Sequence, residues 1–243
     1  LGIIFLQENE LSLAEANFKK AISINPNFIN AHYNLGLVYV KLGKLLKAKE
    51  SYLKVIQINP NFVIALNALG NISNILEKTN DAIYYYKKAI NINPNYADAH
   101  NNLGNALKDS GKFEKAISCY KKAININPNY VQAYYNLGII FEKLNNFQES
   151  INCYKKAIEI KPNYTRAHNN LLFNICWSNK NEKYLEFAKK YYDIIPEFDD
   201  NKFIWPNSSN EKILKVGFVS GDFRNHPLGY FLLDTLKNLK KKI

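Results

Sequence analysis

The sequence has no methionine, only three cysteines and no long apolar run in its 243 residues. A membrane-spanning helix needs about 20 consecutive apolar residues, and no segment approaches that length. No basic-then-apolar signal sequence follows Leu1 either. We therefore expect neither a membrane partner nor secretion. An odd number of cysteines in a chain of this size indicates reduced thiols, which predicts a cytoplasmic protein, with the nucleus as an alternative location.

The missing methionine at Leu1 predicts that the sequence is part of a longer protein. The formal charge of +11 would suit an acidic partner or nucleic acid. The sequence is also rich in Lys, Asn, Ile, Tyr and Phe, a composition typical of a general coding bias. We interpret the charge as composition and predict no nucleic-acid partner.

A period of 34 residues runs through most of the sequence. Prolines, glycines and aromatic residues each recur at this interval: Pro26, Pro60, Pro94, Pro128, Pro162 and Pro196; Gly2, Gly36, Gly70, Gly104 and Gly138; Phe18, Tyr52, Tyr86, Tyr120 and Tyr154. Within one period, apolar residues recur at helical spacing on both sides of Gly43. Each unit is therefore predicted to be a pair of antiparallel helices, with small residues at their close approach and an aromatic ring in the gap.

This pattern resembles the tetratricopeptide repeat family, which implies an all-α superhelical solenoid. Residues 1–164 match, as a truncated first repeat followed by repeats at 29–62, 63–96, 97–130 and 131–164. Residues 165–198 keep the period but have Leu172 and Tyr184 at the positions of the small residues. We interpret 165–198 as a degenerate terminal repeat, because the last unit of such a stack commonly changes composition.

Asparagines recur on the first helix of each unit. Four share one register, which Ala68 interrupts: Asn34, Asn102, Asn136 and Asn170. Neighbouring registers add Asn67, Asn101 and Asn169, and then Asn71 and Asn105. A carboxamide both donates and accepts hydrogen bonds, so a row of them can pair with the peptide groups of an extended protein segment. The alternative is that asparagine is simply abundant in this sequence.

Other candidate sites are excluded by spacing or residue type. His32, His100 and His168 share a register but lie too far apart to hold a metal together, so they are predicted to be packing residues. A clamp for acidic chain termini would need lysines where the sequence has Tyr33, Asn67, Asn101, Tyr135 and Asn169. Cys119 and Cys153 have no base or second ligand nearby in sequence. We predict no metal and no cofactor.

The period stops after Pro196. Residues 199–212 are polar and rich in turn formers, typical of a linker. Residues 213–243 then predict a strand at 213–219, a loop at 220–227 and a helix at 228–239. This order is typical of the first β-α unit of an α/β domain, truncated here, and places the loop where such domains bind ligands.

Residues 215–227, KVGFVSGDFRNHP, resemble the first strand and active-site loop of the O-linked N-acetylglucosamine transferase family. In that family tetratricopeptide repeats precede a glycosyltransferase domain of the GT-B type. The resemblance implies that His226 is an active-site residue. It also implies that the asparagine rows bind protein substrates, and that N-acetylglucosamine passes from its uridine diphosphate donor to Ser or Thr of intracellular proteins. From the residues alone, His226 suits a base or a contact to the donor phosphates, and the alternative is a histidine that only caps the helix or turn.

Three functional hypotheses follow for the complete protein. The first is a protein O-linked N-acetylglucosaminyltransferase whose repeats bind protein substrates and whose donor is a sugar nucleotide. The second is a non-catalytic scaffold that mediates protein–protein interaction through its repeats. The third is a protein O-fucosyltransferase, because Leu228, Gly229 and Tyr230 depart from the animal enzymes of the family and plant-type relatives use a guanosine donor. The 243 residues alone are expected to be inactive as an enzyme.

Overall fold

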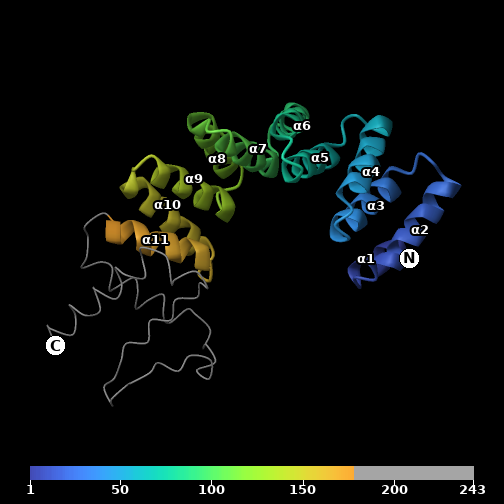
Figure 1. Cartoon of the computed structure of the whole chain (residues 1–243), viewed down its shortest axis with the longest axis horizontal. Coiled ribbons are helices and arrows are strands. Elements are labelled where there is room, and N and C mark those ends of the chain that lie inside the picture. The colour runs from blue at the N-terminus through green and yellow to red at the C-terminus, as the bar shows by residue number, and fades with distance from the viewer. Residues whose placement is uncertain (178–243) are drawn as a thin grey trace, which may run out of the picture. The chain divides into compact units, whose positions relative to one another are not determined.

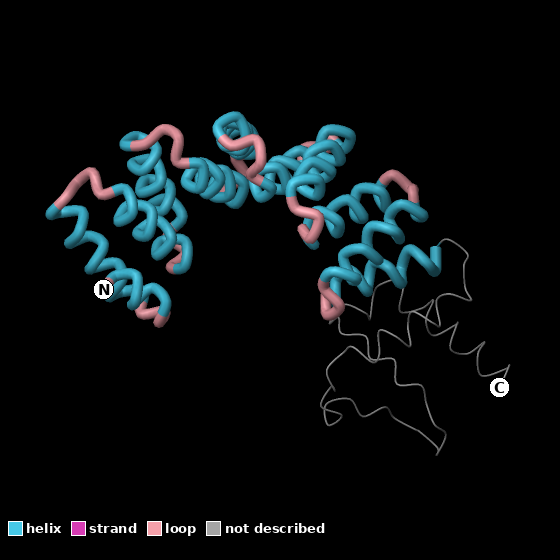
Figure 2. The backbone as a smooth tube through the Cα atoms, turned by 180° about the vertical axis from the view of Figure 1, so that it is seen from behind, coloured by secondary structure: helices cyan, strands magenta, loops and turns pink. Residues whose placement is uncertain are grey.

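A computed structural model describes residues 1–177 of the chain. This part consists of helices joined by short loops (Figures 1 and 2). The chain divides into two compact units, residues 1–140 and residues 141–243. The predicted linker and the predicted β-α unit at 213–243 lie outside the described residues.

The helices of the first unit alternate between the first and the second helix of a repeat. Along the chain they are α1 (Gly2–Gln7), α2 (Leu11–Ile24), α3 (Ile29–Lys41), α4 (Leu45–Ile58), α5 (Val63–Ile75), α6 (Thr79–Ile92), α7 (Ala97–Asp109), α8 (Phe113–Ile126) and α9 (Val131–Lys143), the last of which continues past the unit boundary. Each helix from α1 to α7 packs against the next, and α5 also packs directly against α7. The second unit begins inside α9 and contains α10 (Phe147–Ile160) packed against α11 (Thr165–Trp177). The prediction of an all-helical solenoid built from antiparallel helix pairs is confirmed over the described residues.

A glycine of the first helix faces an aromatic ring of the second helix in every pair of the first unit. A Cβ atom added to Gly36 would lie 2.5 Å from Cε1 of Tyr52, and one added to Gly70 would lie 2.4 Å from Cε1 of Tyr86. Such distances are too short for real carbon atoms. Glycine and tyrosine therefore recur every 34 residues because each pair makes a contact that only glycine permits.

The turn inside each pair passes through one residue with a left-handed backbone. This residue also recurs every 34 positions, as Asn9 (φ 61°), Gly43 (φ 70°), Glu77 (φ 58°), Gly111 (φ 71°) and Asn145 (φ 57°). Glycine and asparagine adopt this conformation readily, whereas other L-residues pay about 1–2 kcal/mol because of their Cβ. Glu77 is therefore the strained member of the series.

The turn between pairs is held by two side-chain contacts. At its start, an asparagine accepts a hydrogen bond from the backbone two residues later, as Asn59 Oδ1 does from Asn61 N at 3.0 Å. The same contact occurs at Asn25, Asn93 and Asn127. In alternate repeats, a buried histidine contacts the proline carbonyl of this turn, as His100 Nε2 does with Pro94 O at 2.9 Å.

We predict that Glu77→Gly raises the free energy of unfolding by about 0.5–1 kcal/mol, because glycine removes the Cβ strain at a positive φ. Chemical denaturation followed by circular dichroism measures this change. Glu77→Ala is the matched control, since it removes the carboxylate but keeps the Cβ. An equal gain from the alanine variant would show that the strain is not in the backbone.

Candidate functional site: the asparagine track

The four asparagines predicted to bind protein lie on first helices, Asn34 on α3, Asn102 on α7, Asn136 on α9 and Asn170 on α11. All four side chains are partly exposed. Their surroundings differ, and two of them belong to a hydrogen-bonded set that runs from α5 through α7 to α9. We call this set the asparagine track, and its members are Asn67, Asn71, Asn101, Asn102, Asn105 and Asn136.

Asn102 links α7 to α5. Its Nδ2 donates to Asn67 Oδ1 and to Asn71 Oδ1, both at 3.1 Å. Its Oδ1 accepts from Asn101 Nδ2 at 3.2 Å. A carboxamide nitrogen carries two hydrogens, so both donors of Asn102 are used within the track.

Asn136 repeats this arrangement one period later, between α9 and α7. Its Nδ2 donates to Asn101 Oδ1 at 3.1 Å and to Asn105 Oδ1 at 3.0 Å. Asn101 therefore joins the two halves of the track, because it donates to Asn102 and accepts from Asn136. The result is one connected network across three first helices.

The core tyrosines orient the outer members of the track. Tyr86 OH donates to Asn71 Oδ1 at 2.8 Å, and Tyr120 OH donates to Asn105 Oδ1 at 2.7 Å. Burial raises the pKa of both tyrosines far above the usual range, so each hydroxyl keeps its proton and remains a donor. These are the same tyrosines whose rings pack on Gly70 and Gly104.

The track leaves a defined set of donors for a ligand. Each oxygen of Asn71 and Asn105 accepts two hydrogen bonds, which fills both lone pairs and fixes the orientation of the amide. No partner within residues 1–177 takes the Nδ2 hydrogens of either residue. Asn71 is exposed and Asn105 partly exposed. The track members whose side chains remain available to donate are thus Asn71 and Asn105. They lie about one helical turn beyond the register of Asn102 and Asn136, which the sequence pattern had favoured.

Asn34 and Asn170 lie outside this network. Asn34 Nδ2 donates to Asn30 O of its own helix at 2.8 Å. In the second unit, Asn170 Nδ2 donates to Tyr154 OH at 3.1 Å, and that hydroxyl donates to Glu142 Oε2 at 2.9 Å. The structure therefore brings Asn102 and Asn136 into one network, and places Asn34 and Asn170 in other surroundings. A role in protein binding stays a prediction for all four.

Sequence inspection alone gave Asn71 and Asn105 no special weight. The sequence carries only a partial signal for them. Where a repeat has asparagines equivalent to Asn67 and Asn71, the following repeat has the donor, 35 and 31 residues later. The reverse does not hold, because the repeat with Tyr135 and Ile139 at these positions is followed by Asn170.

The remaining candidates have structural roles or lie outside the described residues. His32, His100 and His168 each contact a proline carbonyl at 2.7–2.9 Å. A carbonyl only accepts, so Nε2 carries the proton. Burial raises the pKa of the Cys119 thiol, which disfavours a reactive thiolate. In residues 1–177 no group of three His, Cys, Asp or Glu side chains is placed to hold a metal ion. His226 lies outside the described residues.

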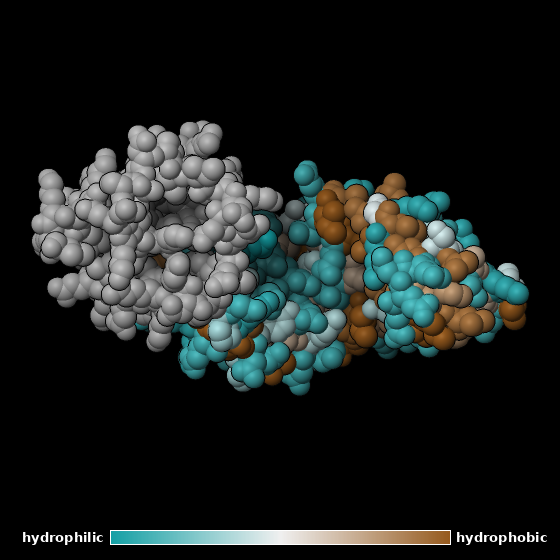
Figure 3. Space-filling view, turned by 90° about the horizontal axis from the view of Figure 1, so that it is seen from below, coloured by the Kyte–Doolittle hydropathy of each residue, from teal (hydrophilic) through white to brown (hydrophobic). Residues whose placement is uncertain are grey.

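The N-terminal end of the first unit is more apolar than the track. The side chains of Leu1, Ile3 and Ile4 are exposed there, and Figure 3 shows hydrophobic residues gathered over this part of the surface. A cleft of about 350 Å³ lies between α1, α2 and α3, with Phe18, Phe28 and Asn34 among its lining residues. No helix of residues 1–177 has the length and apolar character needed to cross a bilayer.

Comparison with family models identifies the repeats. A model described as TPR repeat matches residues 2–43, 74–110 and 104–145, and one described as Tetratricopeptide repeat matches residues 29–62 and 131–164. Together these matches span more than half of the chain. None of the curated proteins compared with the sequence matches it.

Several solved structures share the fold. MamA is 28% identical with a TM-score of 0.61, and the match covers 67% of this chain and 95% of MamA. YrrB, described as a TPR protein with an unusual peptide-binding site, is 26% identical with a TM-score of 0.57, covering 68% of this chain and 86% of YrrB. PilF of Pseudomonas aeruginosa, at 17% identity, has a TM-score of 0.69 and covers 79% of this chain and 92% of its own. This last likeness concerns the fold alone.

We predict that Asn102→Ala lowers the free energy of unfolding by about 1–2 kcal/mol, because two hydrogen bonds between α5 and α7 are lost. Asn34→Ala is the control from the same register and should change it by less than about 0.5 kcal/mol, since only a bond within its own helix is lost. Urea unfolding followed by circular dichroism compares the two variants. Equal losses would contradict a cross-helix role for Asn102.

Proposed function

Because the chain belongs to the tetratricopeptide repeat family, we propose that it is a scaffold that binds other proteins through the asparagine track. The observation that carries this proposal is the fixed orientation of Asn71 and Asn105. Their oxygens are held by buried tyrosine hydroxyls and by the next repeat, and their nitrogens are left to donate. The peptide-binding site ascribed to YrrB supports the same class of ligand.

The ligand best suited to the track is an extended polypeptide, recognised through its backbone. Peptide carbonyl groups accept hydrogen bonds, and Asn71 and Asn105 present carboxamide donors from successive first helices. Asn136 adds an acceptor, because its Oδ1 has no partner within residues 1–177 while its nitrogen is bonded to Asn105. Donor and acceptor side by side match a peptide group, which also has one of each.

The network lowers the cost of binding. A free asparagine side chain loses rotational freedom when a ligand fixes it, and this loss reduces affinity. The contacts within the track hold Asn71 and Asn105 before any ligand arrives. Asn102 and Asn136 therefore act as positioning residues in this proposal, and the backbone contacts make binding broad rather than sequence-specific.

We expect the Asn71→Ala, Asn105→Ala double variant to bind peptide ligands about tenfold more weakly. The estimate assumes two hydrogen bonds worth about 0.5–1.5 kcal/mol each. Peptides selected from a random library on the wild-type chain serve as ligands, and isothermal titration gives the dissociation constants. The double variant Asn91→Ala, Asn125→Ala is the matched control, because these exposed asparagines lie on the second helices α6 and α8. Similar affinities for the two double variants would refute the proposed contacts.

A second proposal concerns the segment that the sequence analysis sets apart. The resemblance of residues 215–227 to an active-site loop favours glycosyl transfer to protein Ser or Thr, with the repeats supplying the substrate. The donor would be UDP-N-acetylglucosamine, or a guanosine-linked fucose in the alternative form of the proposal. His226 would accept the hydroxyl proton or contact the donor phosphates.

For the full-length gene product, we predict that His226→Ala lowers glycosyl transfer by at least about 100-fold, as the loss of a general base does. Transfer of radiolabelled sugar from each nucleotide donor to a protein mixture measures it. Peptide binding by the track should be unchanged in this variant. Wild-type transfer by the variant would remove His226 from the active site, and no transfer by the wild-type protein would leave the scaffold as the function.

A further inference from the structure

The positive charge of the first unit is concentrated on its second helices. Helices α2, α4, α6 and α8 carry ten lysines and four acidic residues. The first helices α3, α5 and α7 carry two lysines and two aspartates. A uniform coding bias would raise lysine on both sets of helices. The second helix of each pair therefore carries the excess positive charge, whereas the asparagine track lies on the first helices.

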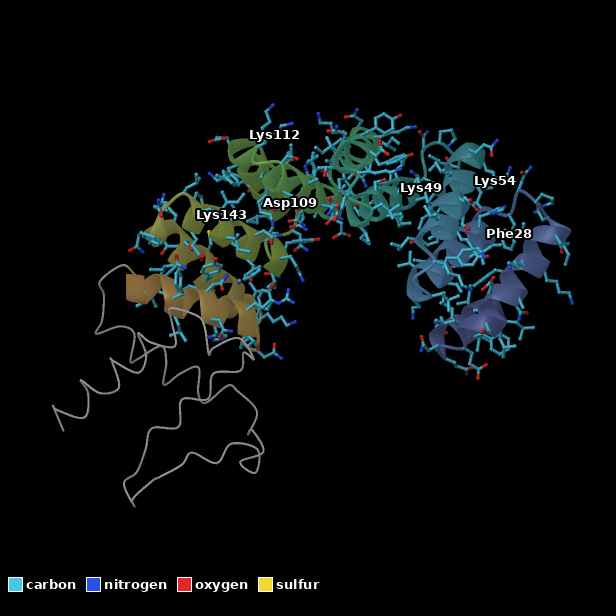
Figure 4. All side chains as sticks on the ribbon, in the orientation of Figure 1. Phe28, Lys49, Lys54, Asp109, Lys112 and Lys143 are labelled. Atoms are coloured by element: carbon cyan, nitrogen blue, oxygen red, sulfur yellow. The ribbon has the colours of Figure 1, made fainter. Side chains whose placement is uncertain are left out.

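The lysines also share a register. Seven of them occupy the same two neighbouring positions on successive second helices, and we call them the lysine stripe: Lys19, Lys20, Lys54, Lys87, Lys88, Lys121 and Lys122. Five are exposed, and Lys54 and Lys88 are partly exposed. Figure 4 shows Lys54 on α4. The positions repeat because each second helix packs in the same orientation, with Tyr52, Tyr86 and Tyr120 turned to the core.

One charge effect reaches from the stripe to the next second helix. Burial raises the pKa of Cys119 on α8, and the charge of Lys87 on α6 opposes that rise. Lys87 therefore lies near the surface of α8 that carries Cys119.

Most of the stripe lacks counter-charges. Lys19 pairs with Glu15 at 2.7 Å, and Lys54 Nζ donates to Gln57 Oε1 at 3.2 Å. Within residues 1–177, no carboxylate pairs with Lys20, Lys87, Lys88, Lys121 or Lys122. A row of unpaired ammonium groups of one sign raises the free energy of the surface through repulsion, and an anionic partner relieves this cost.

We propose that the lysine stripe is a second docking surface of the chain, which binds an extended acidic protein segment. Successive second helices such as α6 and α8 both pack against the first helix between them, α7. Axes of packed helices lie about 8–10 Å apart, so the axes of successive second helices are separated by no more than about 20 Å. An extended chain advances about 3.3 Å per residue, so acidic residues spaced by about three to six positions would meet successive lysine pairs.

Other anionic partners fit the surface less well. Single-stranded nucleic acid binds where aromatic side chains offer stacking platforms between the cations. On the second helices of residues 1–177, Tyr84 is the only aromatic side chain that is largely exposed. An anionic membrane favours lysines mixed with apolar side chains that insert among the lipids, whereas the exposed neighbours of the pairs on α6 and α8 include Asn91, Ser118 and Asn125.

The test uses the whole chain and a fluorescent peptide of about 20 residues with Glu at every third position, which presents carboxylates at about 10 Å and about 20 Å intervals along an extended chain. Fluorescence anisotropy should show binding that weakens about tenfold or more when salt rises from about 50 to 200 mM. The variant with Lys87, Lys88, Lys121 and Lys122 changed to Gln should bind at least about tenfold more weakly, since four of the contacts are lost. Changing the same four lysines to Arg should preserve binding.

A charge-matched control separates the stripe from net charge. Lys41, Lys78, Lys112 and Lys143 lie outside the stripe and are exposed, and Figure 4 shows Lys112 beside α8. Their fourfold change to Gln removes the same charge and should alter binding less than about threefold. An equal loss in the control would overturn the proposal.

Two further probes check the class of partner. A thymidine oligonucleotide of similar charge and vesicles containing phosphatidylserine are titrated against the same proteins. Tighter, stripe-dependent binding of either would overturn the assignment to an acidic protein segment. Ligands selected for the asparagine track should bind the stripe variant as tightly as wild type, which also verifies that the variant is folded.

Discussion

The contact between a glycine and a tyrosine ring within each helix pair is the constraint on which the rest of the structure depends. It sets how closely the two helices approach, since any larger residue at Gly70 or Gly104 would clash with Tyr86 or Tyr120. It also fixes where each tyrosine hydroxyl emerges. That hydroxyl reaches Asn71 or Asn105, so the packing of the core determines the orientation of the surface amides.

The fold could be predicted from the sequence because each recurring residue answers a local requirement. Glycine allows a close approach, tyrosine fills the gap, and proline marks the turn between pairs. These requirements act within one repeat or between neighbours, so a 34-residue period is enough to reveal them. Glu77 was not predictable as a strained residue, because its left-handed backbone is imposed by the turn and contradicts its own preference.

The candidate site could be predicted only in part. The asparagine rows are visible in the sequence, but the row chosen by regularity, which includes Asn102 and Asn136, uses its donors inside the network. Which amides remain available depends on contacts between helices more than 30 residues apart, and counting residues in a register does not reveal those contacts. The lysine stripe likewise could not be predicted from the net charge of the chain. It becomes apparent only when the lysines of the first and second helices are compared.

Each amide of the track that faces outward is held by its own repeat on one side and by the following repeat on the other. A duplicated repeat copied from residues 97–130 would bring both halves of this contact with it, so a longer chain of such units would extend the track in register. A single repeat would hold its outward amide through the tyrosine hydroxyl alone. The length of bound client chain can therefore increase in evolution through duplication of whole repeats. No new type of residue is needed at the binding surface.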